Sequence, residues 1–154
     1  MPGRWYAGTV VGRMNSDGAL EVLVLDCEFL DPKYAHIPRQ TKFTGGTEDG
    51  HPEDKNVLDT RAREKFEETG LRLKHGFHPR LILSKTVSPA HFKNFYFVWE
   101  SECEGELRKV EKIDGNDKLS IPYWKVARSL VGHTDKLYHT HQPALLAAIS
   151  QFDG

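Results

Sequence analysis

Residues 60–71 read Thr-Arg-Ala-Arg-Glu-Lys-Phe-Glu-Glu-Thr-Gly-Leu, and this stretch decides how the rest of the chain is interpreted. Its carboxylates Glu64, Glu67 and Glu68 are spaced i, i+3 and i+4, which places them on one face of an α-helix. Like charges at this spacing cost roughly 0.2–0.5 kcal/mol per pair. A divalent cation would offset that cost, because Mg²⁺ binds through one or two carboxylates, waters and substrate phosphates.

The residues around this stretch predict where the helix begins and ends. Asn56 is the expected N-cap, and the helix then runs to about Thr69. Gly70 fits the left-handed position after the last turn, where Leu71 would contact Phe66 in a Schellman ending.

The helix also needs a buried side. Leu58, Ala62 and Phe66 recur every four residues and are expected to form a buried apolar stripe. That stripe would face away from the carboxylates, so that one side of the helix packs and the other binds. A charged, solvated helix face is the alternative interpretation of the three carboxylates.

A glycine pair upstream changes the balance between these interpretations. With Gly45-Gly46, the stretch resembles the signature of the Nudix hydrolases, G-x5-E-x7-R-E-U-x-E-E-x-G-U, in which U is apolar. The second half of the signature is matched in register by Arg63, Glu64, Glu67, Glu68, Gly70 and Leu71. The resemblance implies an α/β/α sandwich with a mixed central sheet, and hydrolysis of a diphosphate linkage in a nucleoside diphosphate-X type substrate.

The match has three departures. The segment from Gly46 to Arg63 is longer than the signature allows, and Glu53 is the nearest candidate for the isolated Glu without being in register. Counting back from Arg63 places Lys55 at that position instead, and Lys65 occupies an apolar position. The polar segment 47–55 is therefore expected to be a mobile loop over the substrate, outside the metal site.

The resemblance implies a role for each matched polar residue. Glu67 and Glu68 would bind the metal, Mg²⁺ or Mn²⁺, and Glu64 would be a further ligand or the catalytic base. The Gly45-Gly46 backbone would bind substrate and supply a carbonyl ligand. Arg63, one turn before Glu67, would hold that carboxylate in place.

The base is the least constrained role. Glu64 matches the signature, while acids from a later loop are the alternative; the plausible ones are Glu100, Glu102 and Asp117.

The order of predicted elements fits an α+β fold. Strands are expected at 5–11 and 21–27, joined by a turn at 15–18, with an extended segment at 39–44. After the carboxylate helix come an antiparallel pair at 80–87 and 94–100, a segment at 105–112 that could add a strand, a short helix at 123–130 and a helix at 142–152.

Length and composition bound the class of protein. The 154 residues are expected to form one domain, 1–154, and a net charge of −1 argues against nucleic-acid and membrane-surface partners. Cys27 and Cys103 are interpreted as reduced thiols, which favours a cytoplasmic location. The expected partner is a small nucleotide-type molecule. The oligomeric state stays open, with a homodimer among the alternatives.

A second function remains open beside the hydrolase. A catalytically weak or inactive Nudix-fold module, binding or regulating through a nucleotide, is suggested by the long loop and by Lys65. Metal-dependent thermal stability would separate the two, because a metal that binds only the native state raises the melting temperature.

Overall fold

The computed structural model describes residues 5–47, 55–89 and 91–153. The prediction of a mobile loop over 47–55 therefore falls mostly outside the described residues. Within the described ranges, no helix is long and apolar enough to cross a membrane.

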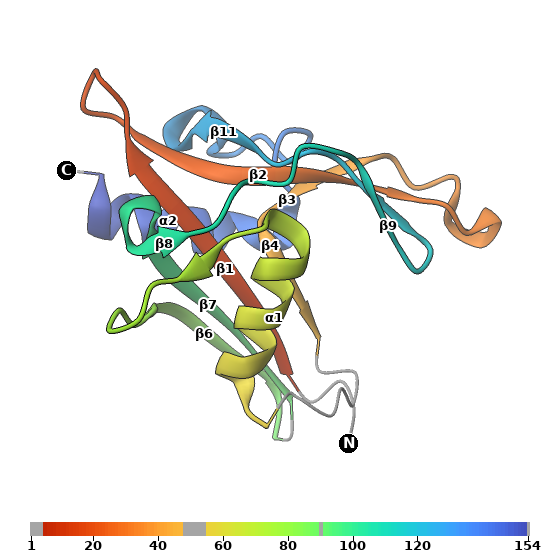
Figure 1. The fold of residues 1–154 in the computed structure, drawn as a ribbon. Helices are drawn as coiled ribbons and strands as arrows, with labels where there is room; N and C mark the ends of the chain where they lie inside the picture. Colours follow the sequence, from red (N-terminus) through yellow and green to blue (C-terminus); the bar gives the residue numbers. More distant parts are fainter. Residues whose placement is uncertain (1–4, 48–54, 90, 154) are drawn as a thin grey trace.

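A large mixed sheet organises the chain (Figure 1). Its strand order is β6 (Arg80–Ser88), β7 (His91–Trp99), β1 (Trp5–Met14), β2 (Leu20–Phe29), β10 (Asp117–Leu119) and β9 (Lys112–Asp114). Off this path, β3 (Gln40–Lys42) and β11 (Tyr123–Val126) pair with β2, and β4 (Thr44–Thr47) pairs with β1. Strands β1 and β7 are parallel and the other pairs are antiparallel.

Helices cover the sheet on both faces. Helix α1 (Val57–Thr69) lies in front of β1 in Figure 1, and α2 (Gln142–Phe152) lies behind it. A small second sheet joins β5 (Arg72–Leu73) to β8 (Cys103–Glu104). Short 3₁₀ helices are η1 (Pro32–Tyr34), η2 (Glu100–Glu102), η3 (Ala127–Leu130) and η4 (His139–His141). The predicted α+β class, with a mixed sheet between helices, is confirmed.

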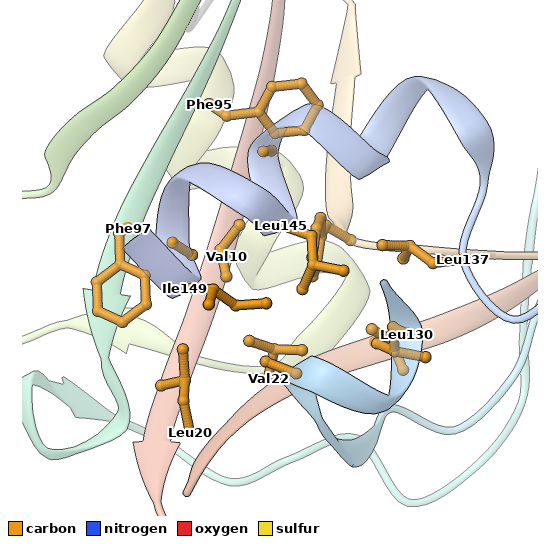
Figure 2. Packing of buried hydrophobic residues seen from close by; sticks show 14 residues of the cluster. Val10, Leu20, Val22, Phe95, Phe97, Leu130, Leu137, Leu145 and Ile149 are labelled. Atoms are coloured by element: carbon orange, nitrogen blue, oxygen red, sulfur yellow. The ribbon is translucent and has the colours of Figure 1, made fainter. Parts of the chain in front are cut away.

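The main core lies between the sheet and α2 (Figure 2). Val10 and Phe97 from β1 and β7 pack there with Leu145 and Ile149 of α2. Burying a side chain of this kind stabilises the fold by about 1.5–3 kcal/mol relative to leaving it exposed. Because α2 is anchored through these contacts, the residues just before it are held against the sheet.

The first hairpin forms as predicted. Strands β1 and β2 pair antiparallel, and the Asn15 side chain accepts hydrogen bonds from the backbone N–H groups of Asp17 and Ala19, both at 2.9 Å. Gly18 has a φ of 79°, a left-handed conformation that glycine adopts without steric cost.

Helix α1 begins and ends where the sequence indicates. The Asn56 side chain caps it by accepting from Asp59 N–H, and Gly70 closes it with a φ of 87° and an N–H bond to the Phe66 carbonyl. The predicted contact between Leu71 and Phe66 stays a prediction. Leu71 packs into a cluster with neighbours from the sheet, whereas the Phe66 ring lies 4.0 Å from the Arg72 guanidinium.

The buried face of α1 is a correction to the prediction. Leu58 and Phe66 are 44% and 41% exposed, and Ala62 is exposed as well, so the predicted apolar stripe faces outward. The buried side chains are Thr60, Arg61, Glu64, Lys65, Glu68 and Thr69. The helix is turned this way because the Glu68 carboxylate bonds to Thr44 and Gly45 of the glycine-bearing strand, and that requirement overrides apolar periodicity.

The predicted short helix at 123–130 is also wrong in its first half. Residues 123–126 form β11, which pairs with β2 over Val24 to Glu21, and only Ala127–Leu130 turns into a 3₁₀ helix. Tyr123 and Trp124 favour strands, and β2 offered them a free edge. The segment 105–112 forms no strand until Lys112, where β9 begins.

Candidate metal and substrate site

The glycine pair lies inside strand β4, paired with β1, and not in a turn. A Cβ on Gly46 would lie 2.5 Å from the Glu64 carboxylate, and one on Gly45 would lie 2.5 Å from the Tyr6 hydroxyl and 2.8 Å from the Ala7 carbonyl oxygen. Real Cβ atoms do not approach other atoms so closely. Glycine is therefore needed at both positions because other atoms approach so closely. A left-handed backbone is not the reason, because neither residue has a positive φ.

Glu68 is fixed by three neighbours from the strand side. Its Oε1 accepts from Gly45 N–H at 2.8 Å and from the Thr44 hydroxyl at 2.7 Å. Its Oε2 lies 3.4 Å from Lys42 Nζ, and the Glu68 side chain is only 3% exposed. Burial disfavours the charged form of Lys42, but the charge and hydrogen bond of Glu68, together with Tyr6 and Cys27, outweigh it and raise the pKa of that lysine.

Glu64 lies one turn before Glu68 and is 7% exposed. Burial raises the pKa of Glu64 to about 7, and the Glu68 charge adds to this, while Arg63 works against it. A carboxylate with such a pKa can take up a proton near neutral pH, which is what a general base requires.

Arg63 lies between the carboxylates of Glu64 and Glu67. Its Nη1 is 3.2 Å from Glu64 Oε1 and 3.4 Å from Glu67 Oε2. The Glu67 side chain is 36% exposed, so it is the most accessible of the three. The arrangement fits an orienting role for Arg63.

The carboxylate oxygens of α1 suit a hard divalent cation, but they do not by themselves supply all of its ligands. In the described part of the chain, no group of three or more His, Cys, Asp and Glu side chains is arranged to hold a metal ion. Glu64 and Glu68 are buried like charges on consecutive turns, an arrangement that a cation would stabilise. Mg²⁺ commonly uses one or two carboxylates and fills its other positions with water and substrate oxygens, so these residues fit.

The later acids differ in what surrounds them. Both Glu102 oxygens are held by Arg80 at 2.8 and 2.9 Å, which lowers the Glu102 pKa. Glu100 is partly exposed, 3.9 Å from Arg13. Burial raises the pKa of Asp117, the charge of Lys42 lowers it, and the charges of Asp114 and Glu68 add to the rise.

Several contributors to the site were missed by the sequence analysis. Lys42 pairs with Glu68, and Arg108 Nε donates to the Glu68 carbonyl at 3.0 Å, binding the end of α1. Strand alternation around the glycine pair could have singled out Lys42, because residues 42, 44 and 46 share one side of an extended segment. Arg108 has no comparable local signal.

A buried histidine, His141, bonds to the backbone between β3 and β4. His141 Nδ1 accepts from Phe43 N–H at 3.0 Å, so the neutral ring carries its proton on Nε2 and donates it to the Tyr6 hydroxyl oxygen at 3.2 Å. Burial lowers the pKa of His141 to about 3, helped by the charge of Lys42. The Tyr6 hydroxyl proton stays available for another acceptor.

Lys65, the residue that departs from the signature, is buried under α1. It is 1% exposed, and its Nζ lies 3.6 Å from Cys103 Sγ. Arg61 is 4% exposed beside it, and its Nε has no partner among the described residues. Burial lowers the pKa of Lys65 and of Arg61. Two cations thus lie in the layer between α1 and the sheet.

Comparison with known proteins identifies the fold. No family model and no curated protein matches the chain. Among solved structures, a MutT Nudix hydrolase from Burkholderia pseudomallei is similar over 94% of this chain and 96% of its own, with a TM-score of 0.59 and 20% identity. The Nudix domain of Shewanella oneidensis NrtR, complexed with ADP ribose, is similar over 96% and 86%, with a TM-score of 0.62 and 14% identity.

A third neighbour gives the same result. A MutT/Nudix family protein from Listeria innocua is similar over 98% of this chain and 94% of its own, with a TM-score of 0.61 and 14% identity. The expected Nudix fold is thereby confirmed.

Proposed function

We propose that this Nudix-fold chain is a divalent-metal-dependent hydrolase that cleaves a diphosphate linkage in a nucleoside diphosphate-X type substrate. One observation carries the proposal: Glu64 and Glu68 are buried as like charges against the glycine pair of β4. A helix that needed only a solvated face would not bury these carboxylates. Their burial is reasonable if a cation completes the site.

The metal would be held by the buried Glu68 and the more accessible Glu67, with Glu64 either a further ligand or the catalytic base. A carbonyl of the Gly45-Gly46 backbone is a further candidate ligand. When bound, Mg²⁺ or Mn²⁺ would neutralise charge on the diphosphate oxygens and activate the attacking water.

The side chains then divide the remaining tasks. Glu64 is our choice for the base that takes the proton from the attacking water, because its pKa of about 7 suits that transfer. Arg63 would hold Glu64 and Glu67 in position. Should Glu64 be occupied as a ligand, Asp117 is the later acid whose surroundings suit the task best.

The substrate assignment is supported by analogy of fold. ADP ribose, bound in the structure of the NrtR Nudix domain, contains a diphosphate between two ribosyl groups. A small nucleotide-type molecule of this kind is proposed for this chain, with the backbone at Gly45 and Gly46 close to it.

A nucleotide-binding module without catalysis is the second candidate. Lys42 favours it, because the ammonium group pairs with Glu68 and reduces the negative charge available to a metal. The two candidates make different predictions for turnover.

Thermal unfolding with increasing Mg²⁺ or Mn²⁺ tests the metal site. We expect the melting temperature to rise with metal concentration and the rise to disappear in the double variant Glu64→Gln/Glu68→Gln. Glu28→Gln, on the exposed side of β2, is the control and should keep the full response.

A hydrolysis screen with phosphate detection tests turnover. Nucleoside diphosphate sugars, dinucleoside polyphosphates and nucleoside triphosphates are the substrates to compare, with and without metal. A metal response without hydrolysis of any diphosphate would support the binding module. The absence of both the metal response and hydrolysis would overturn the proposal.

A further inference from the structure

A cavity of about 560 Å³ is lined by residues of α1 and β5. Cations outnumber acids in its wall, whose charged residues are Arg61, Arg63, Lys65 and Arg72 against Asp59 and Glu67. Both acids are already engaged, because Asp59 accepts from the Lys55 N–H at 2.9 Å and Glu67 lies 3.4 Å from Arg63. The cavity is therefore electropositive.

Arg61 has an unsatisfied polar group in this wall. The residue is 4% exposed, and its Nε is buried with no hydrogen-bond partner among the described residues. Its Nη1 lies 3.5 Å from the Thr9 hydroxyl, which is a long contact. A guanidinium stays protonated in proteins, so the cost of burying this charge is not relieved by loss of a proton. Buried charges are normally paired, and Arg61 therefore calls for an acceptor with negative charge.

Lys65 adds a second cation to the same buried layer. It is 1% exposed, and its Nζ lies 3.6 Å from the Cys103 thiol. Within the described ranges, no carboxylate is among the groups that act on the charge of Arg61 or of Lys65. The two cations also repel each other, because each lowers the stability of the other's charged form.

A bound oxyanion would satisfy this layer better than water or packing would. A water molecule could accept from Arg61 Nε, but it carries no charge, so the repulsion between the two cations would remain. A purely structural layer would be filled as well by apolar side chains, without the cost of burying charge. A phosphate group both accepts hydrogen bonds and supplies negative charge, and its oxygens match the forked N–H groups of a guanidinium.

We infer that the cavity between α1 and β5 binds the phosphate group of a phosphomonoester, with Arg61 and Lys65 as its buried contacts. Arg63 and Glu67 belong both to the cavity wall and to the proposed metal site, so the cavity adjoins the place where a diphosphate would be cleaved. Cleavage of a diphosphate linkage releases phosphomonoesters. The inference rests on the proposed function only for this origin of the ester. Free inorganic phosphate is the other source of the same chemistry.

Ribose 5-phosphate and inorganic phosphate test the site without catalysis. Each is titrated into the metal-free full chain at constant ionic strength, while the ¹⁵N–¹H signal of the Arg61 side-chain Nε is recorded. We expect both to shift this signal saturably in the millimolar range, and the ester to bind at least as tightly as the free ion. A saturable shift with free phosphate alone would overturn the ester as the ligand. No saturable shift with either compound would overturn the site.

Lys65→Met tests the second cation, with the Arg61 signal kept as the probe. We expect its affinity for ribose 5-phosphate to fall by about tenfold or more, because one of two buried charges is removed. Lys109→Met removes an exposed lysine and should stay within about twofold of the native affinity. Lys65→Gln removes the same charge while keeping a polar end, and serves if the methionine variant does not fold. Unchanged affinity in a folded Lys65 variant would overturn the inference.

The hydrolase and the phosphate site are decided by separate measurements, because neither metal nor turnover enters these titrations. Hydrolysis of a diphosphate without any saturable shift of the Arg61 signal would overturn the phosphate site and leave the hydrolase standing. Saturable binding without hydrolysis of any diphosphate would support the phosphate site and overturn its connection to a reaction product.

Discussion

The Glu68 carboxylate accepts a hydrogen bond from the backbone N–H of Gly45, with 2.8 Å between oxygen and nitrogen. This bond joins α1 to β4 at the site where the metal is proposed to bind. It gives Glu68 a structural duty that Glu67, 36% exposed on the same helix, does not have.

Glu68→Gln and Glu67→Gln should therefore separate activity from stability. Both are expected to lower turnover about 100-fold or more, since each removes a proposed ligand. Glu67→Gln should stabilise the metal-free protein by a few tenths of a kcal/mol, about 0.3, because a like charge is removed. Glu68→Gln should destabilise it by about 1–3 kcal/mol, because Lys42 loses its buried partner. Urea unfolding with chelator and steady-state kinetics with metal measure the two effects.

Activity near the native level in both variants would contradict the metal assignment. Equal stability of the two variants would contradict the conclusion that the Glu68 carboxylate holds α1 against β4.

Glu64→Gln tests the base. The native enzyme should show an acidic limb in its pH–rate profile, because the base must be deprotonated to accept a proton from water. We expect Glu64→Gln to flatten that limb and to leave metal affinity within about tenfold of the native value. Metal titration and the pH dependence of kcat are the measurements, with Asp117→Asn as the matched variant. Loss of metal binding in Glu64→Gln, with a flattened limb in Asp117→Asn, would make Glu64 a ligand and Asp117 the base.

Lys65→Met should stabilise the protein. The ammonium group is buried beside Arg61, and its hydrogen-bond partner among the described residues is the Cys103 thiol; replacing a poorly compensated buried charge by an apolar side chain stabilises by about 1–3 kcal/mol. The Lys65 pKa is lower in the folded than in the unfolded chain. Its destabilising effect is therefore greatest at low pH and is lost as pH rises towards the unfolded pKa.

Urea unfolding at pH 6 and pH 9 measures both effects of Lys65→Met, and Lys109→Met is the exposed control. A less stable Lys65→Met variant would show that the charge is compensated in a way the geometry does not reveal.

His141 should make the protein acid-sensitive. Its pKa is about 3 in the folded chain and 6.5 for an ordinary, solvated histidine, so only the unfolded chain binds a proton between these values. Stability is then full above pH 6.5 and falls by up to about 1.4 kcal/mol per pH unit below it. His141→Asn keeps an acceptor for Phe43 N–H without titrating, and should lose about 2 kcal/mol less than the native chain between pH 7 and pH 4.5. Urea unfolding at these pH values is the measurement.

The exposed His75→Asn is the control and should follow the native chain. An unchanged acid dependence in His141→Asn would contradict the role of the buried ring.

Local chemistry explains what the sequence predicted correctly. Asn56 and Gly70 mark the ends of α1 through hydrogen bonds and backbone preferences within a few residues, and the Asn15 turn fixes the first hairpin in the same way. Such interactions involve neighbours in the chain, so the pattern is sufficient.

Long-range contacts explain what it missed. The face that α1 buries depends on Gly45 and Gly46, on a strand that periodicity cannot place against the helix. Residues 123–126 form a strand because β2 lies beside them. The hydrogen bond between Phe43 and His141 joins residues that are 98 positions apart, and the sequence around either residue gives no signal that predicts it.

The parallel pairing of β1 with β7 has a consequence for the order of folding. Trp5 pairs with Phe92, so the centre of the sheet closes only when distant parts of the chain meet, a slow step in folding. Glu68 reaches Gly45 only once β4 has paired with β1. The proposed metal site is therefore expected to form late in folding. Interactions absent from the transition state act on unfolding and not on folding. Metal ions should accordingly lengthen the lifetime of the native state while the refolding rate stays the same.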